Sequence, residues 1–116
     1  RGAEKNIASI AINNLKSLGV RSFDIKAVIG PCIKQCCFQV DRDVAEKFNT
    51  NYSIKSKNSK FMLDLSNVVY DQLIGCGLSK DSILLDADCT FCNKSYFSFR
   101  REGDSAGRMV ALAGWY

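Results

Sequence analysis

Histidine is absent from this chain of 116 residues. The chain therefore cannot supply an imidazole base, a histidine-containing catalytic triad or a histidine metal ligand. It also has no apolar run near the roughly 18 residues that a membrane-spanning helix needs, so we expect no membrane segment. A single proline and eight glycines exclude collagen-like and proline-rich composition. A fibre, a membrane protein and a histidine-dependent catalytic centre within this chain are thus excluded.

The composition that remains is that of an ordinary folded domain. Hydrophobic residues make up 47% of the chain and charged residues 24%, which is enough apolar surface for one core. Sixteen basic and twelve acidic residues give a formal charge of +4. These charges are scattered, which is typical of a solvated surface. We expect one domain without a strong signal for nucleic-acid binding.

Six cysteines are too few for a disulfide-stapled scaffold. We expect reduced thiols and a cytoplasmic location, since no secretion signal precedes them. Cys32-x3-Cys36-Cys37 and Cys89-x2-Cys92 could in principle provide four thiolates for zinc. The two residues inside the second group lack the glycine of a typical zinc knuckle. We therefore favour the interpretation that the cysteines are small hydrophobic residues in a packed core.

Hydrophobic periodicity predicts alternating helices and strands. Residues 49–60 are polar and predict a surface loop, and residues 102–107 predict a turn between two final strands. Strands that alternate with helices predict an α+β fold of mixed α/β layers. The expected helices span residues 7–18, a short stretch after Asp41 and residues 65–76, and the expected strands span 25–29, 83–85, 96–99 and 109–113.

Two loops could bind a ligand. At Gly30-Pro31-Cys32 a strand ends in a sharp turn, a place where binding groups often lie, although a purely structural turn fits equally well. Arg100, Arg101 and Arg108 bracket a glycine-containing loop, and arginine forks suit phosphate oxygens. A solvated hairpin tip is the alternative. The residues alone predict an α/β domain with an anion-binding loop.

Three motifs follow one another along the chain. They are Ile-Gly-Pro-Cys-Ile with Cys-Cys-Phe-Gln-Val (residues 29–40), Met-Leu-Asp-Leu-x-Asn (62–67), and Asp-Cys-Thr with Tyr-Phe-Ser-Phe-Arg-Arg and Ala-Gly-Arg-Met (88–109). Their order and spacing resemble the polyphenol-oxidase or laccase-domain family, whose members are regarded as purine nucleoside phosphorylases. The resemblance covers essentially the whole chain. It implies that residues 1–116 form a single partial domain, the C-terminal half of a mixed-sheet laccase-domain fold with flanking helices.

The resemblance also implies where the family's metal centre lies. The family motif His-Ala-Gly-Trp-Arg-Gly ends in the dipeptide Arg1-Gly2 that opens this chain. The family's zinc ligands, two histidines and one cysteine, would then all lie upstream. We therefore expect zinc in full-length members, but no metal ligand and no catalytic residue in this chain. A multicopper centre needs many histidines, so copper is not expected.

By resemblance, the function is that of part of a zinc-dependent purine nucleoside phosphorylase. It would act on adenosine or inosine, with adenosine deamination as a further activity, and would be inactive alone. Cationic groups must neutralise and position the attacking phosphate. Arg1 adjoins the ligand-bearing motif, so it is the first predicted phosphate contact. Further predicted pocket or phosphate contacts are Gly30, Cys32, Arg100, Arg101 and Arg108.

Two other functions fit the same sequence. The chain could be a non-catalytic half-domain that pairs with a complementary N-terminal half on another chain. An exposed half-core would then drive association. It could instead be a small cysteine-rich module that binds zinc or nucleic acid, and the isolated chain would then hold stoichiometric zinc.

Overall fold

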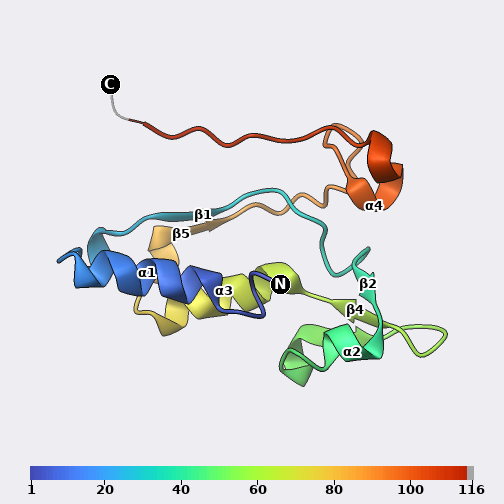
Figure 1. The fold of residues 1–116 in the computed structure, drawn as a ribbon, viewed down its shortest axis with the longest axis horizontal. Helices are drawn as coiled ribbons and strands as arrows, with labels where there is room; N and C mark the ends of the chain where they lie inside the picture. Colours follow the sequence, from blue (N-terminus) through green and yellow to red (C-terminus); the bar gives the residue numbers. More distant parts are fainter. Residues whose placement is uncertain (115–116) are drawn as a thin grey trace.

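In the computed structural model, which describes residues 1–114, two helices cover one face of a pair of parallel strands (Figure 1). The helices are α1 (Ile7–Ser17) and α3 (Leu65–Gly75), which lie side by side. The strands are β1 (Ala27–Ile29) and β5 (Ile83–Leu85). Strands and helices thus form the layers that the sequence predicts, and the α+β class is confirmed.

The two faces of the β1–β5 pair differ in burial because side chains alternate along a strand. One face packs on the helices and joins a core of Ile12, Ile25, Leu73, Leu78 and Ile83. On the other face Val28 and Leu84 stand directly opposite each other and are 71% and 64% exposed. This sheet therefore has one buried face and one uncovered apolar face.

Both long helices end at a glycine, and α3 also begins at a capping aspartate. Gly19 follows α1 with a φ of 89°, and Gly77 follows α3 with a φ of 92°. Glycine adopts this left-handed conformation at little cost, so it commonly ends a helix. At the start of α3 the Asp64 carboxylate accepts a hydrogen bond from the Asn67 backbone N–H at 3.0 Å. The helices predicted over 7–18 and 65–76 are confirmed within a residue at each end.

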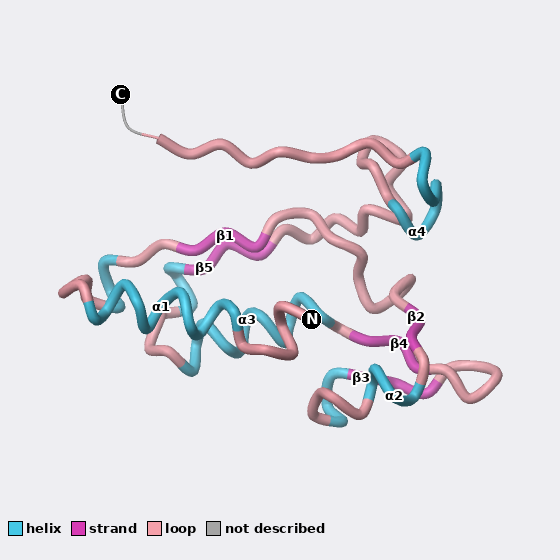
Figure 2. Tube along the Cα trace, in the orientation of Figure 1, coloured by secondary structure: helices cyan, strands magenta, loops and turns pink. Residues whose placement is uncertain are grey.

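A second, antiparallel sheet lies beside the short helix α2 (Arg42–Ala45) (Figure 2). Its strands occur in the order β2 (Gln39–Val40), β4 (Phe61–Leu63) and β3 (Ser53–Lys55). Buried side chains of β2, α2 and β4 form a separate small core of Val40, Ala45 and Leu63. Short 3-10 turns at Ser22–Asp24, Thr50–Tyr52, Lys80–Ser82 and Gly103–Ser105 connect the elements.

The prediction of one continuous loop over residues 49–60 is wrong. The segment contains a 3-10 turn and strand β3, which pairs with β4. The turn forms because the Asn49 side chain accepts a hydrogen bond from the Asn51 N–H. The strand forms because β4 offers it a hydrogen-bonding edge, and this edge pairing does not require an apolar sequence.

The two strands predicted at residues 96–99 and 109–113 are also wrong. Residues 96–98 lie outside any helix or strand, and helix α4 (Phe99–Glu102) begins at the last residue of the first predicted strand. Residues 106–114 run as an extended chain on the side of β1–β5 away from the helices (Figure 1), outside any ladder of the described residues. The apolar pattern correctly indicates an extended backbone, but a strand also needs a neighbour.

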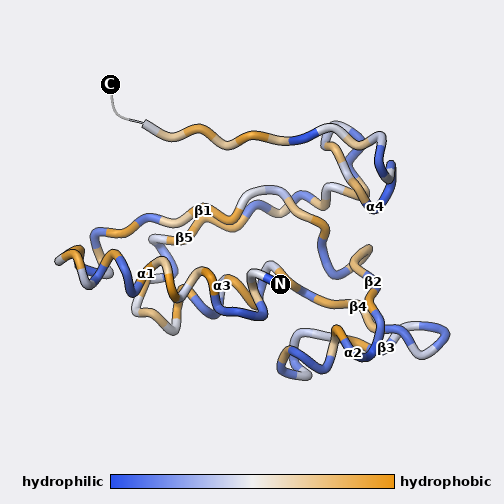
Figure 3. Tube along the Cα trace, in the orientation of Figure 1, coloured by the Kyte–Doolittle hydropathy of each residue, from blue (hydrophilic) through white to orange (hydrophobic). Residues whose placement is uncertain are grey.

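The chain is less compact than its length allows. The Cα radius of gyration is 15.6 Å, against about 13 Å for a closed domain of this size. Much of the extended C-terminal stretch is apolar, as its orange colour in Figure 3 shows. Its residues Val110 and Leu112 are exposed. None of the described helices is long and apolar enough to cross a membrane.

Candidate functional site

The loops that follow β1 and β5 lie side by side and form the candidate site. We call residues 30–38 and 86–98 the loop pair. The Asp86 N–H donates to the Ile29 carbonyl at 2.9 Å, and the Thr90 N–H donates to the Cys32 carbonyl at 3.1 Å. Cys32 and Cys89 therefore continue the parallel pairing beyond the strands. The carboxyl ends of parallel strands meet at one edge, where α/β proteins commonly bind ligands.

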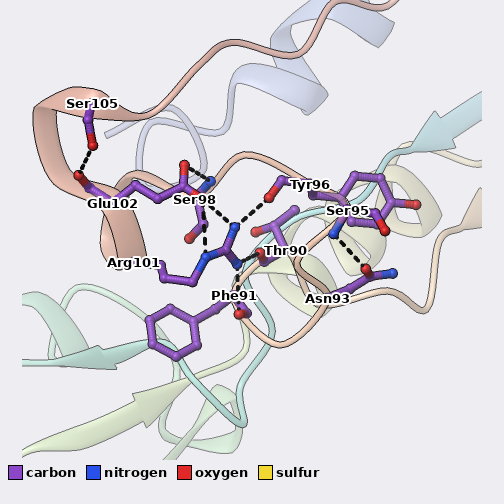
Figure 4. Close-up of polar contacts among 9 residues, drawn as sticks. All are labelled: Thr90, Phe91, Asn93, Ser95, Tyr96, Ser98, Arg101, Glu102 and Ser105. Carbon is purple, nitrogen blue, oxygen red and sulfur yellow. Dashed lines mark hydrogen bonds and ion pairs between the residues drawn. The ribbon is translucent and has the colours of Figure 1, made fainter.

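Arg101 of α4 holds the second loop in place (Figure 4). Its Nη1 donates to the Thr90 and Phe91 carbonyls at 2.7 and 2.8 Å, and its Nη2 donates to the Tyr96 carbonyl at 2.6 Å. It also forms an ion pair with Glu102. The Arg101 side chain is only 20% exposed. The N–H groups of the guanidinium thus donate mainly to backbone carbonyls of the protein itself.

The Arg101–Glu102 pair predicts a pH effect. Hydrogen bonding to Arg101 lowers the pKa of Glu102 from its ordinary value of 4.5. A carboxyl whose pKa is lower in the folded state adds stability above its unfolded pKa and loses it as the pH falls through the folded value. Below about pH 5, we expect the free energy of unfolding of Glu102→Gln to decrease less steeply with falling pH than that of the unaltered chain. Urea titrations at several pH values measure this, and parallel curves for the two proteins would contradict it.

The other two predicted arginines, Arg100 and Arg108, donate to carbonyls outside the loop that Arg101 holds. Arg100 Nη1 donates to the Gln39 carbonyl at 2.7 Å, and its guanidinium lies 5.2 Å from the centre of the Phe38 ring. Arg108 Nη1 donates to the carbonyls of Ala106 and Gly107 at 2.6 and 3.1 Å. Each arginine thus binds backbone carbonyls of a different segment, and phosphate contact by them stays a prediction.

Four of the six predicted site residues line four different clefts among residues 1–114. Arg1 lines a cleft of about 260 Å³ together with Lys47 and Phe48. Gly30 lines one of about 510 Å³, Cys32 one of about 150 Å³ and Arg100 one of about 350 Å³. These four residues thus lie in separate clefts.

One polar cleft was missed by sequence reasoning. It measures about 360 Å³ and its lining includes Tyr52, Asp71 and Gln72. The Tyr52 hydroxyl donates to the Asp71 carboxylate at 2.7 Å, and this hydrogen bond raises the pKa of Tyr52. The lining comes from segments far apart in the chain, so no local motif could have indicated it.

Four of the six cysteines gather in the loop pair. The Sγ atoms of Cys36, Cys37, Cys89 and Cys92 all lie within 4.8 Å of one another. Cys36 and Cys92 are exposed, and all six thiols are free. The interpretation of these cysteines as packed core residues is therefore wrong for Cys36 and Cys92. The Cys32 sulfur does not belong to the group. Within residues 1–114, the four clustered cysteines are the ones whose side chains could hold a metal ion.

The Cys89 thiol has an unusual environment. Burial by itself would raise its pKa, but hydrogen bonds from the backbone N–H groups of Lys34, Cys92 and Phe91 outweigh burial and lower the pKa to about 6. The opposite holds for Cys37, where burial and the neighbouring thiols raise the pKa. A thiolate in this cluster would therefore form first at Cys89.

The comparisons with known proteins place this chain in one family. Residues 1–115 match the family model described as multi-copper polyphenol oxidoreductase laccase. The chain is 33% identical over 102 residues to a purine nucleoside phosphorylase of Aquifex aeolicus. The alignment covers 88% of this chain and 47% of that protein. It is 30% identical to adenosine deaminase RL5 of an unknown prokaryotic organism, with coverage of 93% and 44%.

A solved structure agrees with these relatives. The crystal structure of the hypothetical protein YfiH from Bacillus licheniformis superposes with a TM-score of 0.79 at 30% identity, over 86% of this chain and 41% of that one. The chain thus spans less than half the length of these relatives. The motifs, the fold and the family match agree, and the chain belongs to the multi-copper polyphenol oxidoreductase laccase family.

Proposed function

We propose that this chain supplies the C-terminal half of a purine nucleoside phosphorylase domain. Such a domain would split adenosine or inosine with phosphate into the free base and ribose-1-phosphate. The observation that carries the proposal is the match of residues 1–115 to the family, together with relatives named purine nucleoside phosphorylase that are more than twice as long as the matched region. A relative named adenosine deaminase supports deamination as the second candidate activity.

We further propose that the catalytic metal centre is built outside this chain. The zinc ligands expected for the family include two histidines, and this sequence contains no histidine. The donor set of the chain therefore does not fit that centre or a histidine-rich copper centre. The chain alone should then be inactive. Its free thiols favour the reducing cytoplasm as its location.

The uncovered face of the β1–β5 pair supports pairing with a complementary half. Val28 and Leu84 are exposed there, and the extended segment 106–114 finds no ladder partner among the described residues. Apolar surface of this kind commonly marks an interaction site. An N-terminal half-domain would cover it, whether or not the assembled domain is catalytic. A non-catalytic pairing partner remains the alternative function.

Phosphate needs cations near the anomeric carbon that it attacks, because the anion must be held in line with the departing base. Arg1 is the first proposed contact, since its cleft also contains Lys47, which forms an ion pair with Glu4 of the same cleft at 3.8 Å. Arg100 shares its cleft with Lys60, which forms an ion pair with Asp41 there. Arg108 is followed by Met109, which lines the same cleft as Gly30. Gly30 and Cys32 are proposed pocket residues, and Arg101 would have to leave the carbonyls that it binds.

The test compares the endogenous product that contains this sequence with the recombinant chain of 116 residues. We expect the endogenous product to have a mass above 12.9 kDa and to release ribose-1-phosphate from adenosine or inosine with phosphate. The recombinant chain should release none. Equal turnover by the recombinant chain would contradict the proposal, and so would an inactive endogenous product of higher mass.

In the active product, Arg1→Ala should raise the KM for phosphate about tenfold, the equivalent of about 1.4 kcal/mol of lost binding. Arg21→Ala is the matched control, because Arg21 forms an exposed ion pair with Asp24. Phosphate KM values that are the same in both variants would exclude Arg1 as a phosphate contact.

A further inference from the structure

The four sulfurs in the loop pair have the spacing of a metal site. A tetrahedral zinc ion with Zn–S bonds of about 2.3 Å places its sulfurs about 3.8 Å apart. The Cys92 Sγ lies 3.9 Å from the Cys36 Sγ and 3.2 Å from the Cys37 Sγ. All four sulfurs, including that of Cys89, lie within 4.8 Å of one another. Small side-chain rotations would suffice to bring them to the distances of a zinc tetrathiolate.

The backbone around Cys89 is already arranged for a thiolate. Its Sγ accepts a hydrogen bond from the Lys34 N–H at 3.4 Å. Donors aimed at sulfur stabilise its charged form. The turn over Thr90 and Phe91 has no glycine, but Arg101 holds both of their carbonyls. Arg101 thus stabilises a turn that in zinc knuckles commonly contains a glycine.

The sulfurs also come from two segments that are far apart in the sequence. Cys36 and Cys37 belong to the loop after β1, and Cys89 and Cys92 belong to the loop after β5. A disulfide would use two of these sulfurs and leave two, whereas a tetrahedral ion uses all four. Exposure of Cys36 and Cys92 gives an ion a route into the cluster.

We propose that Cys36, Cys37, Cys89 and Cys92 together bind one Zn²⁺ ion, which fastens the two loops of the loop pair to each other. Four zinc–sulfur bonds form to four thiolates, each thiol that is still protonated releases its proton to solvent, and no electron is transferred. With four protein ligands the site is closed, so its role is structural. It differs from the two-histidine centre expected for the family, because every ligand belongs to this chain.

The test uses the full 116-residue chain, purified under reducing conditions. We expect one zinc per chain by elemental analysis, and the visible absorption of a tetrahedral cobalt thiolate after replacement with Co²⁺. Cys36→Ser and Cys92→Ser alter exposed ligands, so these variants should fold. Each should weaken zinc binding by at least about 10-fold, because even the loss of a hydrogen-bond partner of a metal ligand typically costs about 10- to 100-fold in affinity. Cys76→Ser is the matched control, because Cys76 lies at the end of α3 outside the cluster.

Folding and metal binding are separated by thermal unfolding. Added zinc should raise the melting temperature of the unaltered chain and of Cys76→Ser, but not that of Cys92→Ser. Retention of zinc by Cys92→Ser at the affinity of the control would overturn the proposal. So would a reduced chain without zinc, or a Cys37–Cys92 disulfide in the native product. None of these measurements uses catalysis, so their outcome does not depend on the proposed function.

Discussion

Replacing Arg101 with alanine is expected to destabilise the fold by about 3 kcal/mol. The side chain donates to the carbonyls of Thr90, Phe91 and Tyr96, and hydrogen bonds from a charged donor contribute more than neutral ones. Without the guanidinium these carbonyls lose their donor in a half-buried setting, and water replaces it only in part. Urea unfolding of the two proteins measures the difference.

Two further variants identify the cause of this loss. Arg100→Ala removes an arginine that donates to a single carbonyl, so it should cost less than about 1 kcal/mol. Arg101→Lys keeps the charge but replaces a planar fork with a single ammonium, so it should recover little of the stability. Equal losses for Arg101→Ala and Arg100→Ala would show that the carbonyl contacts do not carry the effect.

The role of these arginines illustrates what a sequence does not show. A loop rich in arginine indicates positive charge, but it does not indicate which oxygens the charge will meet. The carbonyls that Arg101 binds become available only after residues 89–96 have folded into a turn. That turn depends on the pairing of Cys32 with Cys89, which joins distant parts of the chain. Phosphate binding and backbone support are therefore indistinguishable from the local sequence.

The strands show the same boundary between local and long-range information. The strand predicted over 83–85 is confirmed as β5, and the one predicted over 25–29 is confirmed for residues 27–29, which form β1. Turn residues flank both apolar runs, and β1 and β5 also pair with each other. The run at residues 109–113 has an equally apolar pattern, but no described strand lies in a ladder with it. Local sequence predicts an extended backbone, while a sheet requires a second segment.

The cysteines mark a third limit. The spacing Cys-x2-Cys correctly predicts that Cys89 and Cys92 lie together, but it does not reveal which upstream cysteines join them. Cys32 pairs with Cys89 through the backbone, and the sulfurs of Cys36 and Cys37 complete the cluster instead. The register of the parallel pairing decides this, and register is set by the whole β1–β5 layer.

Leu63→Ala should destabilise the second core by about 3 kcal/mol. Leu63 is 0% exposed and lies in the central strand β4, where it packs with Val40 and Ala45. Truncation removes apolar contacts and leaves a cavity that the flanking strands cannot close without losing their pairing. A loss of this size is a large part of the roughly 6 to 17 kcal/mol expected for a domain of this length.

Ile54→Ala is the matched control for this prediction. Ile54 lies on the edge strand β3 and is exposed, so its loss should cost less than about 1 kcal/mol. Urea unfolding followed by tyrosine fluorescence compares the stability of the two variants. Tyr52 packs against this core, so its environment changes when the core unfolds. Equal losses would mean that the small antiparallel sheet is not held by its core. A much larger loss for Leu63→Ala would show instead that the three short strands depend on one buried side chain, because a strand of three residues makes too few ladder hydrogen bonds to hold itself.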